Sequence, residues 1–379
     1  MATLSSLPIG AKIKVPHSVM GNVIFLKADQ NHTGYPENST TLITDELILL
    51  RAFDAKEQNN TDSNRRQYGN NRYSVSNIDH WLNSTASAGQ WYSPQHSTDQ
   101  SPNSTNVVSR NPYDTDAGFL AGFDPRFIEA MQDTTIKVAT YNSGYDTLTR
   151  KVFLPSKAEL FNQDENSIME GSLLQYFQAN TNSIRIAKIS TYCAEDNNNK
   201  GSSSITAGSN GNYWIRTPDT ETAGNLRYVR SDGALILSGN AKDGIGIRPL
   251  CNLKTETLVS DQPDSDGCYS LILGATGEIE LTYNVKETAT TPTAVNVELD
   301  LVKTFGCSTT VEICNNGNDA EPVWEDISTV VKSGVNHIFA NKTKTADNWK
   351  IVIKIHIVRN ATVGDIKLYG VKTTFKEEL

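Results

Sequence analysis

The sequence contains no apolar run that approaches the roughly 20 residues needed by a membrane-spanning helix. It also lacks any block of Lys or Arg, since 34 basic residues are outnumbered by 43 acidic ones and the formal net charge is −9. Nucleic acid binding depends on clustered positive charge that neutralises phosphates. We therefore expect neither nucleic acid binding nor membrane insertion. The N-terminal residues lack a basic region followed by an apolar core of signal-peptide length, so we expect synthesis in the cytoplasm without export by the usual route.

Cysteine is scarce, with five residues, an odd number, and no CxxC pair. Structural zinc sites need paired ligands at short spacing, so we interpret the cysteines as reduced and mostly buried. The sequence has no GxSxG, HExxH, EF-hand or phosphate-loop pattern, and we expect no metal, no cofactor and no enzymatic activity. Carboxylates can pair in space without a sequence signal, so a glycoside-hydrolysing enzyme stays open as an alternative. The cysteines are Cys193, Cys251, Cys268, Cys307 and Cys314.

What the sequence does contain is a set of short strand patterns joined by turns, between Asn212 and Leu253. Large side chains alternate in Tyr213–Thr217 and Leu226–Arg230, and Ser231–Gly233 has the composition of a tight hairpin turn. Two further strands are predicted, at Ala234–Leu237 and Ile245–Pro249.

Aromatic and polar side chains are mixed in this stretch, and the mixture has two interpretations. The period of two places Trp214 and Arg216 on one face of their strand, either as a core locked by a paired arginine or as a ligand platform. Aromatic rings with neighbouring amide and guanidinium groups suit the faces and hydroxyls of sugars. The candidate ligand-binding residues are Trp214, Arg216, Asn225, Arg227, Tyr228 and Asp243.

Helix-start signals occur at several polar residues. Ser76 and Asp79, and Ser156 and Glu159, have the spacing of capping boxes. Pro125 follows Asp124 in the arrangement of a capped first turn. Helices are also expected at Thr44–Phe53 and Glu170–Phe177.

Two domains are expected, residues 1–273 and 274–379, each with a core of its own. The polar segment Ser260–Gly267 marks the change in composition, and Cys268–Leu273 is apolar enough to add a last strand to the first domain. The second domain has only strand patterns, predicting an all-β sandwich. Its strands are predicted at Glu280–Lys286, Val295–Val302, Thr309–Cys314, Val335–Ala340, Trp349–Val358 and Ile366–Thr373.

Several ordered motifs in the first domain resemble a family common in prophages of Gram-positive bacteria, which has no assigned activity. They are Ser76–Ile78 before Trp81–Asn83, Lys151–Ser156, Tyr213–Pro218, and Gly246–Pro249. The closing pattern is similar to the C-type lectin-like fold of formylglycine-generating enzymes, although the cysteine pair of those enzymes has no counterpart beside Cys251. The second domain, with the segment Pro322–Asp326, looks like a β-sandwich of phage tail and fibre proteins.

The resemblance implies an α+β fold, a C-type lectin-like domain followed by an all-β, jelly-roll-like sandwich. It implies a phage virion fibre or tail (or head-fibre) protein that binds the host surface, with glycans as the expected ligand. The expected partners are a host glycan or receptor, other virion proteins and further copies of the chain, a trimer being favoured because avidity strengthens weak sugar contacts. The alternatives are a purely structural virion or decoration protein and, third, a polysaccharide-degrading enzyme.

Overall fold

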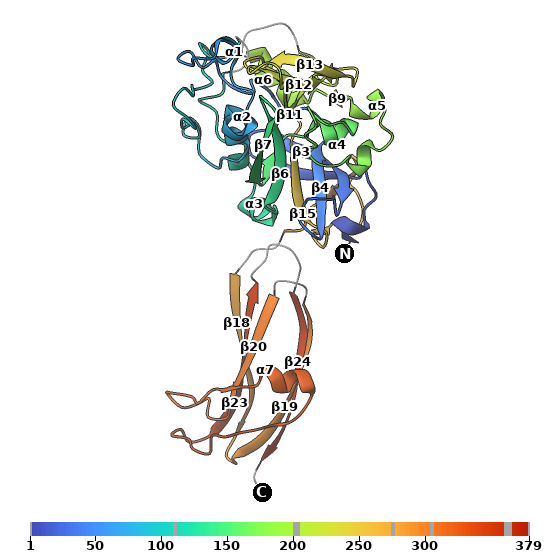
Figure 1. The fold of residues 1–379 in the computed structure, drawn as a ribbon. Coiled ribbons are helices and arrows are strands. Elements are labelled where there is room, and N and C mark those ends of the chain that lie inside the picture. Colours follow the sequence, from blue (N-terminus) through green and yellow to red (C-terminus); the bar gives the residue numbers. More distant parts are fainter. Residues whose placement is uncertain are drawn as a thin grey trace. The chain divides into compact units, whose positions relative to one another are not determined.

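The computed structural model describes residues 2–108, 112–199, 205–273, 277–303, 307–359 and 366–377. The chain divides into two compact units, Met1–Ile272 and Leu273–Leu379 (Figure 1). Strands make up 39% of the protein and helices 14%. The expected α+β class with a C-type lectin-like domain is therefore wrong, because short strands in several sheets dominate the fold. The expectation that each part folds alone stays a prediction.

The largest sheet of the first unit has six strands, in the order β17-β2-β3-β4-β15-β8. Neighbouring strands are antiparallel except β17 and β2, which run parallel. The predicted last strand is confirmed as β17, and Lys14 of β2 pairs with Asp264 and Asp266 just before it, at 2.5 and 2.6 Å. The strands are β2 (Lys12–His17), β3 (Gly21–Gln30), β4 (Ser39–Thr44), β8 (Val152–Phe153), β15 (Leu250–Lys254) and β17 (Cys268–Ser270).

A five-stranded sheet, in the order β13-β12-β11-β14-β5, contains the strands predicted between Asn212 and Leu253. All six residues of β11 are buried, whereas β12 and β13 are partly exposed. The turn between β12 and β13 contains Gly233 with φ of +82°, as the tight-turn pattern predicts. The strands are β5 (Leu50–Arg51), β11 (Tyr213–Pro218), β12 (Asn225–Val229), β13 (Leu235–Asn240) and β14 (Ile245–Gly246).

Three strand pairs and short helices complete the first unit (Figure 1). Among the described residues, no helix has the length and apolar character required to cross a bilayer. The pairs are β1 (Ala2–Thr3) with β16 (Leu258–Val259), β6 (Thr134–Thr140) with β7 (Gly144–Arg150), and β9 (Ala187–Lys188) with β10 (Asn210–Gly211). The helices are α1 (Ser63–Tyr68), α2 (Asn77–Leu82), α3 (Pro125–Ala130), α4 (Lys157–Phe161), α5 (Asn182–Arg185) and α6 (Thr191–Asn199), with 3-10 turns η1 (Leu4–Ser6), η2 (Tyr73–Val75), η3 (Phe119–Gly122) and η4 (Gln175–Phe177).

The predicted capping residues are confirmed where they lie at the start of short helices. Ser76 caps α2, and Ser156 and Glu159 form a full capping box at α4. The helix predicted at Thr44–Phe53 is wrong, because its backbone N–H groups donate to Lys188 and Ile247, outside any helix.

A helix over Glu170–Phe177 is also wrong for most of its length. Only η4 forms, at its C-terminal end. Gly171 has φ of +122°, a conformation outside the helical region, and the Leu174 N–H donates to the carbonyl of Glu159. The capping residues therefore mark where helices begin, while backbone contacts with other segments decide how long the helices are.

The ion pair between Arg216 of β11 and Glu159 of α4 is buried inside the first unit. Both side chains are at most 1% exposed, and two N–H···O bonds of 2.6 and 2.8 Å join them. Arg216 also donates to the carbonyls of Leu154 and Glu170, while the Tyr35 hydroxyl donates to Glu159 at 2.5 Å. A buried guanidinium is tolerated only with such partners. The pair thus fixes β11, α4 and the chain after β3 and β8 relative to one another.

The second unit consists of two sheets with the strand orders β18-β23-β20-β21 and β22-β19-β24. Its core includes Ile351, Ile353, Ile355 and Ile357, which alternate along β23 as the sequence predicts. Helix α7 (Ser328–Ser333) is not foreseen by the strand patterns. The strands are β18 (Gly277–Thr288), β19 (Pro292–Lys303), β20 (Cys307–Cys314), β21 (Glu325–Asp326), β22 (His337–Ile338), β23 (Trp349–Arg359) and β24 (Ile366–Glu377).

Replacing Glu159 by Gln is expected to lower the free energy of unfolding by about 3–5 kcal/mol, because it leaves the Arg216 guanidinium buried without a counter-charge. The matched control is Glu298→Gln, which removes an exposed partner of Lys372 at 3.3 Å and should change stability by less than about 1 kcal/mol. Urea unfolding followed by circular dichroism measures both. Equal effects would contradict the role assigned to the buried pair.

Candidate functional site

Two of the six predicted ligand-binding residues lie in the core. Trp214 and Arg216 are both 0% exposed. The Trp214 indole donates to the carbonyl of Arg51 at 3.0 Å, and Arg216 is held by Glu159. Of the two interpretations of this strand, the structure selects the core locked by a paired arginine. Their burial removes both residues from the candidate ligand surface.

The other four residues are partly exposed but are engaged within the protein. The Asn225 amide donates to the Ser238 hydroxyl at 2.7 Å, and Asp243 accepts from Asn240 at 3.2 Å. Tyr228 packs edge-on against Trp214, with ring centroids 6.0 Å apart. Arg227 pairs with Glu165 at 2.7 Å and with Asp219 at 3.5 Å. Asn225, Arg227 and Tyr228 share β12, whereas Asp243 lies in the turn after β13.

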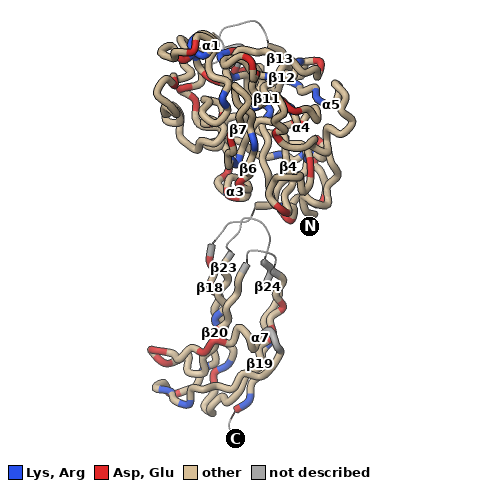
Figure 2. Tube along the Cα trace, viewed as in Figure 1, with Lys and Arg blue, Asp and Glu red and all other residues tan. Residues whose placement is uncertain are grey.

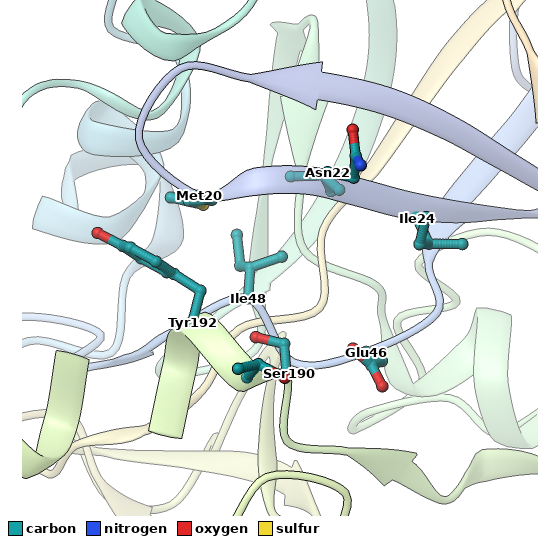
Figure 3. Close-up of a pocket in the computed structure, with 9 residues that line it drawn as sticks. Met20, Asn22, Ile24, Glu46, Ile48, Ser190 and Tyr192 are labelled. Carbon is teal, nitrogen blue, oxygen red and sulfur yellow. The ribbon is translucent and has the colours of Figure 1, made fainter. Parts of the chain in front are cut away.

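A groove lies elsewhere in the first unit. It consists of two adjoining pockets of ≈ 250 and ≈ 230 Å³, which share Met20 and Tyr192 in their walls. Figure 3 shows the first pocket, with the Tyr192 ring of α6 beside Met20. The Ile48 side chain points into the space between β3 and α6. The remaining lining of this pocket is Asn22, Val23, Ile24, Glu46, Ser190 and Thr191.

The floor of the groove is the segment between β4 and β5, which strands on both sides hold in place. The Leu47 N–H donates to Lys188 at 2.8 Å, and the Ser190 N–H donates back to Leu47 at 3.3 Å. The Ile48 N–H donates to Ile247 at 3.1 Å. The Ser190 hydroxyl accepts from the Cys193 N–H at 3.1 Å and so caps the first turn of α6, which carries Tyr192. The groove is therefore largely pre-formed.

His17 positions the wall that carries Met20. Its Nδ1 accepts from the N–H groups of Val19 and Met20, at 3.2 and 3.0 Å, and its Nε2 donates to the Phe119 carbonyl at 3.1 Å. These bonds require the neutral ring, and burial lowers the pKa of His17 accordingly. A side chain at Gly122 would collide with the ring, since an added Cβ would lie 2.0 Å from it. No sequence motif marks His17, because the acceptor of its Nε2–H, the Phe119 carbonyl, lies 102 residues away.

Arg51 lines the second pocket and connects three distant segments. Its guanidinium pairs with Asp116 at 2.7 Å and with Asp196 of α6 at 2.9 Å, and it is 1% exposed. The pairing fixes α6 against the body of the unit. Sequence reasoning missed this arginine, because 65 and 145 residues separate it from its two partners.

The groove combines an apolar floor with hydrogen-bonding groups at the rim, a composition suited to small polar ligands with apolar faces. Burial and the neighbouring Asp45 raise the pKa of Glu46, although Lys12, which pairs with Asp45 at 2.8 Å, opposes this. Among the described residues, no group of three or more His, Cys, Asp or Glu side chains could hold a metal ion. Figure 2 shows acidic and basic positions interspersed along the first unit.

Residues 38–255, more than half of the chain, match the family described as "Domain of unknown function (DUF6273)". The chain belongs to this family. Its matched region includes the groove floor (residues 45–49), α6, and the motifs around Ser76, Ser156, Tyr213 and Gly246. No curated protein matches the chain.

Two solved structures of VP2 from infectious bursal disease virus have low similarity to the chain. One, from derived T=1 particles, is 12% identical with a TM-score of 0.13, and the match covers 65% of this chain and 62% of that one. The other, a subviral particle, is 11% identical with a TM-score of 0.12, and the match covers 65% of this chain and 74% of that one. Scores this low carry no argument about the fold of this DUF6273 protein.

A second carboxyl group, Glu170, lies beside the Arg216–Glu159 pair. It accepts the Ala139 N–H at 2.8 Å and contacts the Thr217 hydroxyl. Burial raises the pKa of Glu170 to about 7, although Arg216 and these hydrogen bonds oppose the rise. The folded protein therefore binds a proton at Glu170 more tightly than the unfolded chain does.

This raised pKa predicts that stability from Glu170 is fully present below about pH 4.5 and is lost as pH rises through about 7. The Glu170→Gln variant keeps a neutral amide that can satisfy Ala139 and Thr217. Relative to the wild type, it should gain up to about 3 kcal/mol between pH 5 and pH 8. Unfolding free energies at both pH values measure the difference, and a pH-independent difference would contradict the assignment.

Proposed function

We propose that this chain is a bacteriophage particle protein that binds the host surface through the groove of its first unit, with glycans as the ligand class. The observation that carries the proposal is the groove itself, where the Tyr192 ring lies beside Met20 on a fixed floor, with Asn22, Glu46 and Ser190 around it. The phage context rests on the resemblance of the sequence motifs to a prophage-associated family.

Sugar recognition needs both an apolar surface and directional polar groups. C–H groups of a pyranose pack on an aromatic ring, while hydroxyls exchange hydrogen bonds with amide and carboxylate oxygens. Tyr192 offers a partly exposed ring, and Asn22 and Glu46 offer an amide and a carboxylate. A pre-formed site loses little entropy on binding, so even a shallow groove can give useful affinity.

In this proposal the protein resides in the virion, and other virion proteins contact it there. Attachment through several copies, three being favoured, would turn weak sugar contacts into firm adhesion. The second unit would attach the first unit to the particle.

The alternative is a structural or decoration protein of the particle without a ligand. The internal pairing of Arg227 with Glu165 favours it, because an arginine already engaged at 2.7 Å gives less to a ligand. Binding measurements on the isolated protein separate the two functions.

The probes are purified Gram-positive cell walls and the glycan from them that the wild type binds best. The Tyr192→Ala variant is expected to bind both at least about tenfold more weakly than the wild type, a loss of about 1.4 kcal/mol. The matched control is Tyr145→Ala, which removes a 55% exposed ring from β7 and should leave binding unchanged. Pull-down on walls and titration calorimetry with released glycans measure the affinities.

Correctly folded wild-type protein that binds neither walls nor glycans would overturn the adhesin function and favour the structural alternative. Wild-type binding that Tyr192→Ala does not change would instead remove the groove as the site. Release of soluble sugars during incubation would show an enzyme and contradict a purely binding role.

A further inference from the structure

The sandwich of the second unit is closed along one side. Helix α7 packs between β19 and β20, and Glu325 of β21 connects to the other sheet. Its carboxylate accepts from His337 of β22 at 2.8 Å and from the N–H groups of Ala340 and Asn341 at 3.0 Å each. The strands β21 and β22 therefore lie on the same side of the sandwich, and the two sheets are sealed there.

The opposite side is formed by β18 and β24, which end the two sheets away from β21 and β22. Each strand has 12 residues, and among the described residues β18 pairs only with β23 and β24 only with β19. The ends of the two strands meet where the Thr290 hydroxyl donates to Glu377 at 3.0 Å. A strand of this length runs for about 40 Å. Long unpaired edges are sites where another chain can add.

Apolar side chains of the core reach this open side without being covered. Ile279 and Tyr283 lie opposite Ile357 and Ile353 of β23, so they face the core side of their sheet. Yet Ile279 is 57% exposed and Tyr283 is 38% exposed. On β24, Phe375 lies opposite the buried Val295 but is itself only partly buried. Apolar residues of the core side are thus partly exposed along β18 and β24.

We propose that a second copy of this chain covers the open side, with β18 of one copy lying beside β24 of the next. The strand directions permit this arrangement. β18 and β19 run in opposite directions on either side of the 289–291 connection, and β19 is antiparallel to β24, so β18 and β24 run the same way. Rotation about an axis parallel to the strands does not reverse the strands. It therefore places β18 of each copy beside β24 of its neighbour, with both strands running the same way.

Charge complementarity supports a second copy as the occupant. Glu287, near the end of β18, and Lys376, near the end of β24, lie at the same end of the sandwich, where Thr290 contacts Glu377. Both lie on the outer faces, opposite Lys350 and Ala294 respectively, and both are exposed. With β18 beside the β24 of a neighbour, the carboxylate of one copy meets the ammonium group of the other. The contact forms whether or not the first unit binds a glycan.

The full chain is therefore expected to be an oligomer, dimer or trimer, by sedimentation or light scattering. Ile279→Lys should shift it to monomer, raising the dissociation constant at least about tenfold, since a charge then faces the apolar contact. Val335→Lys is the matched control, because Val335 is 60% exposed in the segment between α7 and β22 on the sealed side. It should remain oligomeric, and circular dichroism checks that both variants fold.

Charge exchange provides a second, independent readout. Glu287→Lys and Lys376→Glu should each weaken association, more at low salt than at high salt, and the double variant should restore it. A monomeric wild type would overturn the proposal, as would an oligomer that Ile279→Lys leaves intact. A double variant weaker than either single variant would overturn the pairing of β18 with β24.

Discussion

The buried ion pair of Arg216 and Glu159 is the constraint on which the first unit depends. A guanidinium in a dry core needs a counter-charge and hydrogen-bond acceptors. The two terminal nitrogens of Arg216 find them in Glu159 of α4 and in the Leu154 and Glu170 carbonyls, and the Tyr35 hydroxyl donates to the same carboxylate. The pair therefore selects one arrangement among the many that short strands could adopt. A second carboxyl group, that of Glu170, lies in the same dry environment, and its burial raises its pKa to about 7.

The sequence is sufficient to predict structure wherever a local rule decides it. The alternation in β11, β12 and β23, the Gly233 turn and the capping box at Ser156 follow from side-chain period and hydrogen bonding within a few residues. The Thr44–Phe53 helix fails because backbone groups of Leu47 and Ile48 pair with distant strands, which no local pattern encodes. The same holds for Glu170–Phe177, where the Leu174 N–H donates to the carbonyl of Glu159. The α+β class is implied by the lectin-like resemblance, and the strands that dominate both units contradict it.

For the site, too, local patterns predict the strands but not the contacts between distant segments. A strand with Trp214 and Arg216 on one face has two interpretations, and only the contacts of Glu159 and Arg51 decide for the core. The groove could not be predicted, because Met20, Ile48 and Tyr192 come from three segments that contacts distant in sequence bring together, among them those of His17, Lys188 and Asp196. In the proposed function, the first unit holds the ligand on a fixed frame, and the second unit gathers copies through its open side, so that each supports firm attachment to a host.

The central claim is that a glycan binds in the groove of the first unit. Its most direct test is backbone hydrogen exchange, measured by mass spectrometry, on the full chain with and without cell-wall glycans. Binding in the groove predicts increased protection in peptides spanning residues 45–51 and 190–196, since these segments form its floor and wall. Protection confined to residues 225–243, the strands β12 and β13 with the following turn, would contradict the groove and place the ligand on the surface that carries Asn225, Arg227, Tyr228 and Asp243.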